Sequence, residues 1–230
     1  SKGNAFPDNS NAMIQILDSS KDGITLQFQL PALPELETFS TEDEEIFTQV
    51  NIPGSLSTVK PGDPSLPYFA FQLGIPFGVD PRVDVFVEKS QEIALIAPVF
   101  PTQKQIYTTS FPRLDIGDGL FSMQEESVFA KNEEVYSSNV AYPVNHAVIL
   151  NDGVLRSQRI VSLGVFPIQY LPKEQALSLT EKITVTIAFL GEYQADESAS
   201  ISEPFDSVLA ANLINYEDAI AWRSQSAGLR

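Results

Sequence analysis

The stretch KITVTIAF, residues Lys182–Phe189, decides the fold class of this chain. Apolar residues alternate in it with threonines and an alanine at a period of two. The apolar positions are Ile183, Val185, Ile187 and Phe189. Because successive side chains of a β-strand point to opposite faces, this pattern predicts a strand with one face buried in a core and the other in contact with solvent.

Comparable β-rich runs recur along the chain, and the 16 prolines stand mostly between them. A proline there removes no hydrogen bond from a sheet. The runs are Met13–Leu17, Ile24–Leu30, Ile46–Ile52, Tyr68–Ile75, Val83–Val87, Ile93–Ala97, Ala147–Leu155, Ile160–Tyr170 and Leu177–Phe189. Many short strands with this punctuation predict an all-β fold, an antiparallel β-sandwich of jelly-roll type, rather than alternating strands and helices.

The spacing also suggests two regions. Residues 1–190 are expected to form the sandwich, with a long, weakly patterned loop over 98–131 that is either functional or mobile. Residues 191–230 begin with a polar linker, YQADESASISE, and continue into a short helix indicated by the spacing of apolar residues over 205–214. A processing tail that carries Arg223 and Arg230 is expected to follow this helix on a tether.

Composition excludes several classes of function. The chain has 14 Lys and Arg against 30 Asp and Glu, a formal net charge of −16, and it has no basic run. Since phosphate backbones repel such a surface, nucleic acid is not an expected partner. No segment has the length and apolarity of a membrane helix, so membrane insertion is not expected either. The acidic stretch TEDEE (Thr41–Glu45) is interpreted as a solvated face.

The residues for common catalytic chemistry are scarce. The chain has no cysteine and one histidine, His146, so a Ser/His/Asp triad would have to use that residue. His146 opens a strand-like run without a nucleophile pattern nearby, and an ordinary structural role is expected for it. DIGDG (Asp115–Gly119) lacks the ligand ladder of a calcium loop and is interpreted as a turn. No metal or cofactor is expected.

Four pieces of the sequence together resemble the propeptide of the gingipain-like cysteine proteases of family C25. GDPSLPYF (Gly62–Phe69) is similar to the element that leads into a strand of those prodomains, and LIAP (Leu95–Pro98) to the strand end before their long loop. RSQRIVSLGVFPIQYLPKEQALSLTEKITVTI (Arg156–Ile187) matches a strand, a hairpin turn and the next strand. Phe205, followed after nine residues by NYE (Asn215–Glu217), is similar to the family's closing helix.

The resemblance implies a non-catalytic prodomain of a secreted or cell-surface protease, whose own signal peptide is absent from this chain. Such a prodomain assists folding of the cysteine protease domain encoded downstream in the same precursor, and it keeps that protease latent. The resemblance further implies that a loop presents a basic residue to the S1 pocket of the protease. A guanidinium suits such a pocket because its planar fork can pair with a carboxylate through two hydrogen bonds.

The resemblance also suggests site residues. It places the inhibitory loop within 98–131, where Lys104 is the candidate by position and Arg113 the candidate by chemistry. Arg223 and Arg230 are the candidates for the bond that is cleaved on maturation. Arg156 and Arg159 match arginines of the family pattern and are expected to serve the sheet.

Two other functions remain open from the sequence. A carbohydrate- or protein-binding β-sandwich of a surface protein would carry exposed aromatic residues on a sheet face or loop rim, with Tyr68, Phe69 and Phe71 as candidates. The shared parity of Phe69 and Phe71 favours the core instead. A glycosidase-like carboxylate pair is the second alternative, because pairing of acids in space is not visible in a sequence.

Overall fold

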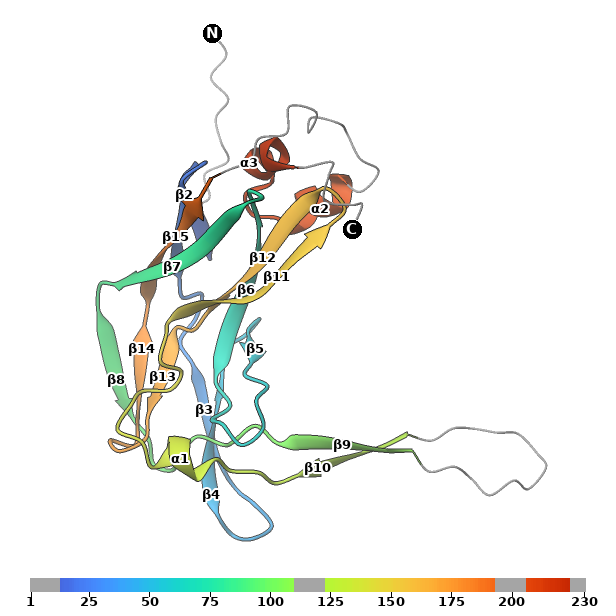
Figure 1. The fold of residues 1–230 in the computed structure, drawn as a ribbon. Helices are drawn as coiled ribbons and strands as arrows, with labels where there is room; N and C mark the ends of the chain where they lie inside the picture. Colours follow the sequence, from blue (N-terminus) through green and yellow to red (C-terminus); the bar gives the residue numbers. More distant parts are fainter. Residues whose placement is uncertain (1–12, 110–122, 193–205, 224–230) are drawn as a thin grey trace, which may run out of the picture.

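The computed structural model of the protein describes residues 13–109, 123–192 and 206–223. These residues form antiparallel sheets that stack into a sandwich, with the short C-terminal helices at one end and, at the other, a projecting hairpin and the short helix α1 (Glu133–Tyr136) (Figure 1). The all-β prediction and the short C-terminal helix are confirmed. No helix among the described residues has the length and apolarity needed to cross a bilayer.

Two four-stranded sheets form the main layers. The first has the order β1-β2-β15-β7, from β1 (Ile14–Ser20), β2 (Gly23–Gln29), β15 (Lys182–Gly191) and β7 (Val79–Val87). The second has the order β11-β12-β6-β5, from β11 (Ala147–Leu155), β12 (Gln158–Val165), β6 (Pro67–Ile75) and β5 (Leu56–Ser57). Rings meet between the layers, where Phe28 of β2 lies 5.3 Å from Phe69 and 6.2 Å from Phe71 of β6, between ring centroids.

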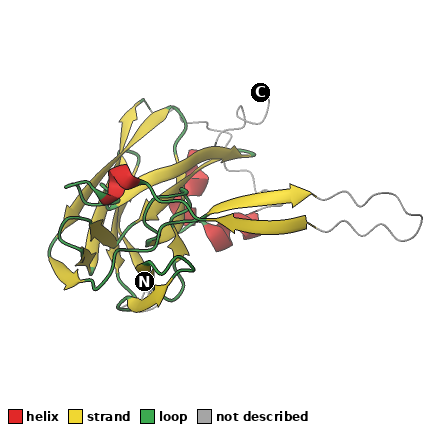
Figure 2. Ribbon diagram, turned by 90° about the horizontal axis from the view of Figure 1, so that it is seen from below, coloured by secondary structure: helices red, strands yellow, loops and turns green. Residues whose placement is uncertain are grey.

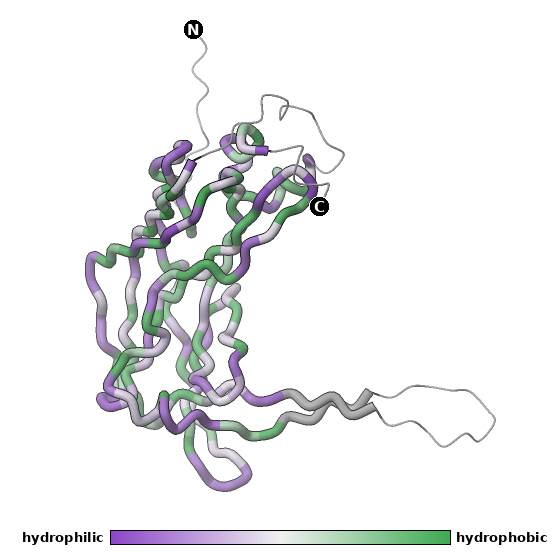
Figure 3. The backbone as a smooth tube through the Cα atoms, in the orientation of Figure 1, coloured by the Kyte–Doolittle hydropathy of each residue, from purple (hydrophilic) through white to green (hydrophobic). Residues whose placement is uncertain are grey.

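Strand β15 confirms the pattern from which the fold was predicted. Ile183, Val185 and Ile187 are fully buried, and Thr186 on the opposite face is exposed. Strand β2, which pairs with β15, and strand β6 of the other sheet alternate in the same way, with buried Ile24, Leu26 and Phe28 in β2 and Phe69, Phe71 and Leu73 in β6. Figure 3 shows hydrophobic and hydrophilic residues interspersed along the tube of the sandwich.

Two runs predicted as single strands are each divided between sheets. Ile160–Tyr170 contains the end of β12 and then β13 (Ile168–Leu171), which are separated by Phe166 and Pro167. Leu177–Phe189 contains β14 (Ala176–Thr180) and β15, separated by Glu181. In both places the chain leaves one sheet and joins another, because β13, β14 and β8 (Ser90–Ala94) form a sheet of their own.

A two-stranded sheet, β3 (Glu35–Ser40) and β4 (Ile46–Asn51), completes the lower end. The acidic residues 42–45 occupy its turn and are exposed, which confirms that TEDEE is a solvated face (Figure 3). Strand β3 was not predicted, because its side chains are mostly exposed and lack the apolar alternation of a half-buried strand.

Candidate functional site

The segment 98–131, expected to be a loop, contains a β-hairpin in the structure. Strand β9 (Lys104–Thr109) pairs antiparallel with β10 (Met123–Val128), in register from Lys104 opposite Val128 to Thr109 opposite Met123. The hairpin projects away from the sandwich in both views (Figures 1 and 2). Such strands pair with each other outside the core, so the core-facing apolar pattern that reveals a strand in a sequence is absent.

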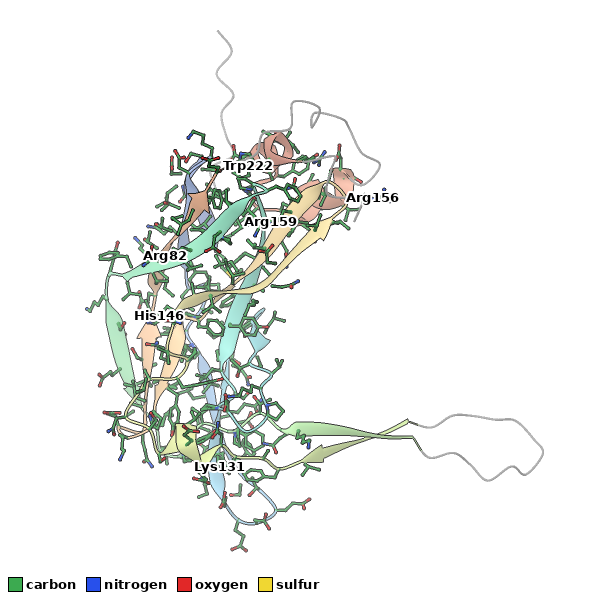
Figure 4. The ribbon with its side chains drawn as sticks, in the orientation of Figure 1. Arg82, Lys131, His146, Arg156, Arg159 and Trp222 are labelled. Atoms are coloured by element: carbon green, nitrogen blue, oxygen red, sulfur yellow. The ribbon has the colours of Figure 1, made fainter. Side chains whose placement is uncertain are left out.

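The inhibitory candidates have different positions relative to this hairpin. Lys104 is exposed and is the first residue of β9, at the base of the hairpin rather than at its far end. Arg113 lies outside the described residues, and so does the DIGDG stretch. Lys131, the third basic residue of the segment, is engaged at the root of the hairpin, 3.2 Å from Glu133 and 5.4 Å from the centroid of the Tyr136 ring (Figure 4). Lys104 and Arg113 both stay predictions for the residue that enters the S1 pocket.

Two segments of chain connect the hairpin to the sandwich, an entering leg (residues 98–103) and a leaving leg (residues 129–132). The entering leg is held between β4 and the segment that contains Ser65. On one side, Thr48 of β4 donates its amide to Pro98 O at 2.7 Å and its hydroxyl to Ala97 O at 2.9 Å, and it accepts from the Phe100 amide at 2.8 Å. On the other side, the Ser65 amide donates to Phe100 O at 2.8 Å. The entering leg is therefore fixed before β9 begins.

Aromatic side chains fill the space below the hairpin. Phe100, on the entering leg, lies 5.5 Å from Phe47 and 5.0 Å from Phe39, and Phe129, on the leaving leg, lies 5.9 Å from Phe47, all between ring centroids. Phe47 is buried. Tilted and edge-to-face contacts of this kind contribute about 0.5–1.5 kcal/mol each beyond the area that they bury. Both legs are thus anchored to β3 and β4.

The turn Gly62–Pro64 lies within the stretch that resembles the family element, and its backbone contacts both legs of the hairpin. The Gly62 amide donates to Thr102 O at 2.8 Å, and the Thr102 amide donates to Asp63 O at 2.8 Å. On the other leg, the Asn132 amide donates to Gly62 O at 2.8 Å. Gly62 has φ +87°, and a Cβ atom there would lie 3.2 Å from the Asn132 nitrogen, so this close approach suits a glycine.

Three tyrosines near this root have raised pKa values. Burial is the main cause, and it raises the pKa of Tyr142 to about 12, with further contributions from the charge of Asp63 and a hydrogen bond to it. Burial also raises the pKa of Tyr136, whose hydroxyl donates to Val99 O at 2.7 Å, and that of Tyr170. These side chains are neutral phenols at physiological pH and act as donors and as core surface.

The C-terminal segment packs onto the sandwich at the opposite end from the hairpin (Figure 1). It consists of α2 (Asp206–Asn212), α3 (Tyr216–Ala219) and the 3₁₀ turn η1 (Ile220–Trp222). Asn215 accepts a hydrogen bond from the Gly74 amide and donates one to Gly74 O, both at 2.8 Å. Leu209, Leu213, Ala219 and Trp222 are buried in the core cluster. The helix predicted from the spacing is confirmed, but it forms part of the core.

The two processing candidates differ in what the structure describes. Arg223 was expected on a tether, whereas its side chain is only 3% exposed. Its Nη2 atom donates to Asp206 Oδ1 at 2.7 Å, and its guanidinium carbon lies 5.9 Å from the centroid of the Tyr216 ring. Trp222, just before it, meets Phe189 edge-on at 5.8 Å. Arg230 lies outside the described residues.

His146 and the internal arginines have structural environments. His146 Nδ1 lies 2.9 Å from Phe166 O, and the residue borders an open depression of about 520 Å³ between β7 and residues 144–149 (Figure 4). Arg159 joins Asp152 through two bonds, of 3.0 and 2.6 Å, and donates to Val79 O at 2.7 Å, which confirms that it serves the sheet. Arg156 is exposed in the turn between β11 and β12.

The aromatic residues proposed for a binding module do not form a binding face. Phe69 and Phe71 are buried in the sandwich, and Tyr68 stacks on Phe166 with 5.2 Å between ring centroids. Among the described residues, no group of three or more histidine, aspartate and glutamate side chains could hold a metal ion.

Solved structures of protease prodomains have a similar fold. One, a complex of the pro- and mature domains of RgpB from Porphyromonas gingivalis, matches with a TM-score of 0.64 and 16% identity over 89% of this chain and 98% of the other. Another, which concerns zymogenic latency of gingipain K from the same organism, matches with a TM-score of 0.58 and 22% identity over 79% and 94%. No curated protein gives a significant match to the chain.

The family comparison covers nearly the whole chain. The model of the family Propeptide_C25 matches residues 6–222, a span that includes the sandwich, the hairpin and the C-terminal helices. The resemblance noted in the sequence is thereby confirmed, and the chain belongs to the C25 propeptide family as a non-catalytic propeptide of a gingipain-type cysteine protease.

Proposed function

We propose that this propeptide holds its cognate C25 protease domain latent by presenting a basic residue, Arg113 or Lys104, to the S1 pocket of the protease. It would also assist folding of that domain, be removed by cleavage after Arg223 or Arg230, and act in a secreted or cell-surface precursor. One observation carries the proposal. The segment in which the family resemblance places the inhibitory loop is a hairpin that projects from a rigidly packed sandwich (Figure 2).

A projecting, anchored hairpin suits an inhibitor for a physical reason. A flexible substrate loses conformational entropy when it binds, whereas a loop held on paired strands has already lost much of that freedom. The neighbouring prodomain structures, one in complex with a mature domain and one concerned with zymogenic latency, support the same role. The burial of Phe69 and Phe71 removes the exposed aromatic face that favoured a binding module.

The test measures inhibition of the separately produced protease domain by the separately produced chain. We expect a dissociation constant in the nanomolar range or below. Replacing the residue that enters S1 with alanine should weaken inhibition by about 2–4 kcal/mol, the range of interface hot spots. Arg113→Ala and Lys104→Ala are compared with Arg82→Ala, which removes an exposed arginine of β7 far from the hairpin.

The conservative change Arg113→Lys refines the result. If the S1 pocket pairs with a guanidinium through two bonds, lysine recovers only part of the affinity, because its ammonium group offers no planar fork. No inhibition by the unmodified chain at micromolar concentration would overturn the proposal. Equal weakening by all three alanine variants would exclude a specific S1 residue.

A further inference from the structure

We propose that Asp63 is a positioning residue for the β9–β10 hairpin. Its buried carboxylate, together with the backbone of residues 62 and 63, holds both legs of the hairpin at one angle to the sandwich. The consequence for inhibition rests on the function proposed above, since the angle determines the direction in which the loop is presented.

The angle of the hairpin must be set at its root. Strands β9 and β10 pack extensively against each other, but against no other strand or helix of the described residues. The hairpin stands clear of the sandwich in two perpendicular views (Figures 1 and 2). Two paired strands without a supporting layer are marginal by themselves. Contacts at residues 100–103 and 129–132 therefore have to fix its direction.

Asp63 joins the leaving leg to the sandwich through its side chain and the entering leg through its backbone carbonyl. The residue is 1% exposed. Its Oδ1 atom accepts from Asn132 Nδ2 at 2.6 Å, on the leaving leg, while its backbone carbonyl accepts from Thr102 on the entering leg. Its Oδ2 atom lies 2.9 Å from Lys60 Nζ, in the turn that precedes it. One buried residue thus contacts both legs of the hairpin and Lys60 of its own turn.

A buried carboxylate fixes the direction of the hairpin relative to the sandwich more strongly than an apolar contact would. Burial of an ionised group is unfavourable unless donors surround it, so a swing of the leaving leg that removed Asn132 would leave a charged oxygen poorly paired. An apolar contact has no preferred direction, and it tolerates sliding and rotation. The aromatic contacts of Phe100 and Phe129 stabilise the root, and the Asp63 bonds select its angle.

A second link acts between the legs themselves. The Gln103 side chain donates to Pro101 O at 2.6 Å and accepts from the Ala130 amide at 3.2 Å, so it ties the two legs together just below β9. Among the described residues, the Gln103 side chain bonds only to the two legs. Loss of Asp63 is therefore expected to free the angle while the two strands stay paired.

The experiment uses the absence of cysteine in this chain, which allows two spin labels to be attached at introduced cysteines. Thr108→Cys places one label on β9, and Glu174→Cys places the other in the exposed turn between β13 and β14. Distance distributions from pulsed electron paramagnetic resonance are then compared for the labelled parent, Asp63→Ala and Asn132→Ala. Asp22→Ala is the control, since it removes an exposed aspartate that also pairs with a lysine.

We expect one narrow distance in the parent and in Asp22→Ala, and a broad distribution in Asp63→Ala and Asn132→Ala. Inhibition of the protease should weaken at least about tenfold in these two variants, with thermal unfolding of the sandwich still cooperative. Asn132→Ala leaves the carboxylate paired with Lys60, so it serves as the test if Asp63→Ala fails to fold.

The outcomes separate the two proposals. The positioning role would be overturned if the distance distribution of the parent were as broad as that of Asp63→Ala. It would also be overturned if the distribution stayed narrow in both root variants, Asp63→Ala and Asn132→Ala. Broadening without a loss of inhibition would overturn its link to latency. If the parent itself does not inhibit the protease but the root variants broaden the distance, the positioning role stands and the proposed function is wrong.

Discussion

Asn215, within the NYE motif, links the C-terminal helices to the sandwich through two hydrogen bonds. It is 2% exposed and satisfies both backbone groups of Gly74 in β6. Gly74 has no room for a side chain, because an added Cβ would overlap Ala219 and lie 2.9 Å from Gln158 Nε2. The asparagine and the glycine therefore belong together, and neither tolerates a simple replacement.

We predict that Asn215→Ala lowers the free energy of unfolding by about 2–4 kcal/mol, because a buried N–H or C=O left unpaired costs about 1–3 kcal/mol. Urea denaturation measures the change. Asn212→Ala is the matched control, since that side chain is exposed and bonds only to Val208 O within its own helix. Equal loss in the two variants would contradict the assigned role.

The phenol of Tyr142 predicts a dependence of stability on alkaline pH. Its pKa is about 12 in the folded chain, against about 10 in the unfolded chain. Above pH 10 the unfolded state releases this proton first, so folding stability that is present below pH 10 is lost as the pH rises towards 12. Denaturation at several pH values should show a shallower decline for Tyr142→Phe. Identical alkaline profiles would contradict the prediction.

Among the short elements, the C-terminal helices bury Arg223, one of the two residues proposed above for the maturation cleavage. The ion pair between Arg223 and Asp206 joins the end of η1 to the start of α2, and both ends lie against the core. A protease must draw several residues around the scissile bond into an extended form. Cleavage after Arg223 therefore requires local unfolding of this segment.

We predict that Asp206→Asn accelerates cleavage after Arg223 by an arginine-specific protease, because the buried guanidinium loses its charged partner. Limited proteolysis with mass spectrometry of the fragments gives the rate at that bond. Glu217→Gln, which neutralises an exposed carboxylate on the adjacent α3, should leave the rate unchanged. A rate that does not differ from the parent in Asp206→Asn would show that the pair does not protect the bond.

At the scale of the whole molecule, the net charge of the chain should influence its rate of association with the protease domain. A net charge of −16 is large for 230 residues, and the turn at residues 42–45 concentrates four acids at the hairpin end of the sandwich (Figure 1). Like charges on a partner would slow association, and a basic partner surface would accelerate it.

We predict that the association rate with the protease domain falls at least about tenfold between low and high salt, as expected for steering by opposite charges. Stopped-flow mixing measures this rate. Neutralising residues 42–45 with Gln and Asn should flatten the salt dependence, whereas Glu217→Gln, which neutralises an exposed carboxylate of α3 at the opposite end of the sandwich, should change it little. An association rate that is independent of salt would contradict steering.

The sequence was sufficient for features that depend on local pattern. Alternation over Lys182–Phe189 predicted β15 and its buried face, since period two follows from the geometry of any strand. Helical spacing predicted α2, and the ordered motifs predicted the family. The sheet change at Pro167 and the pairing of β9 with β10 were missed, because neither leaves a core-facing pattern in the sequence.

Contacts between distant residues were decided only by the tertiary structure. Asp63 bonds to Asn132, and Asp206 pairs with Arg223, and neither contact can be predicted from the spacing of these residues in the sequence. Arg223 was predicted to be a tethered cleavage residue from its position after the NYE motif, yet the helices fold back and bury it. Local pattern selects strands and helices by their own geometry, whereas burial and pairing of charges depend on which segments the whole fold brings together.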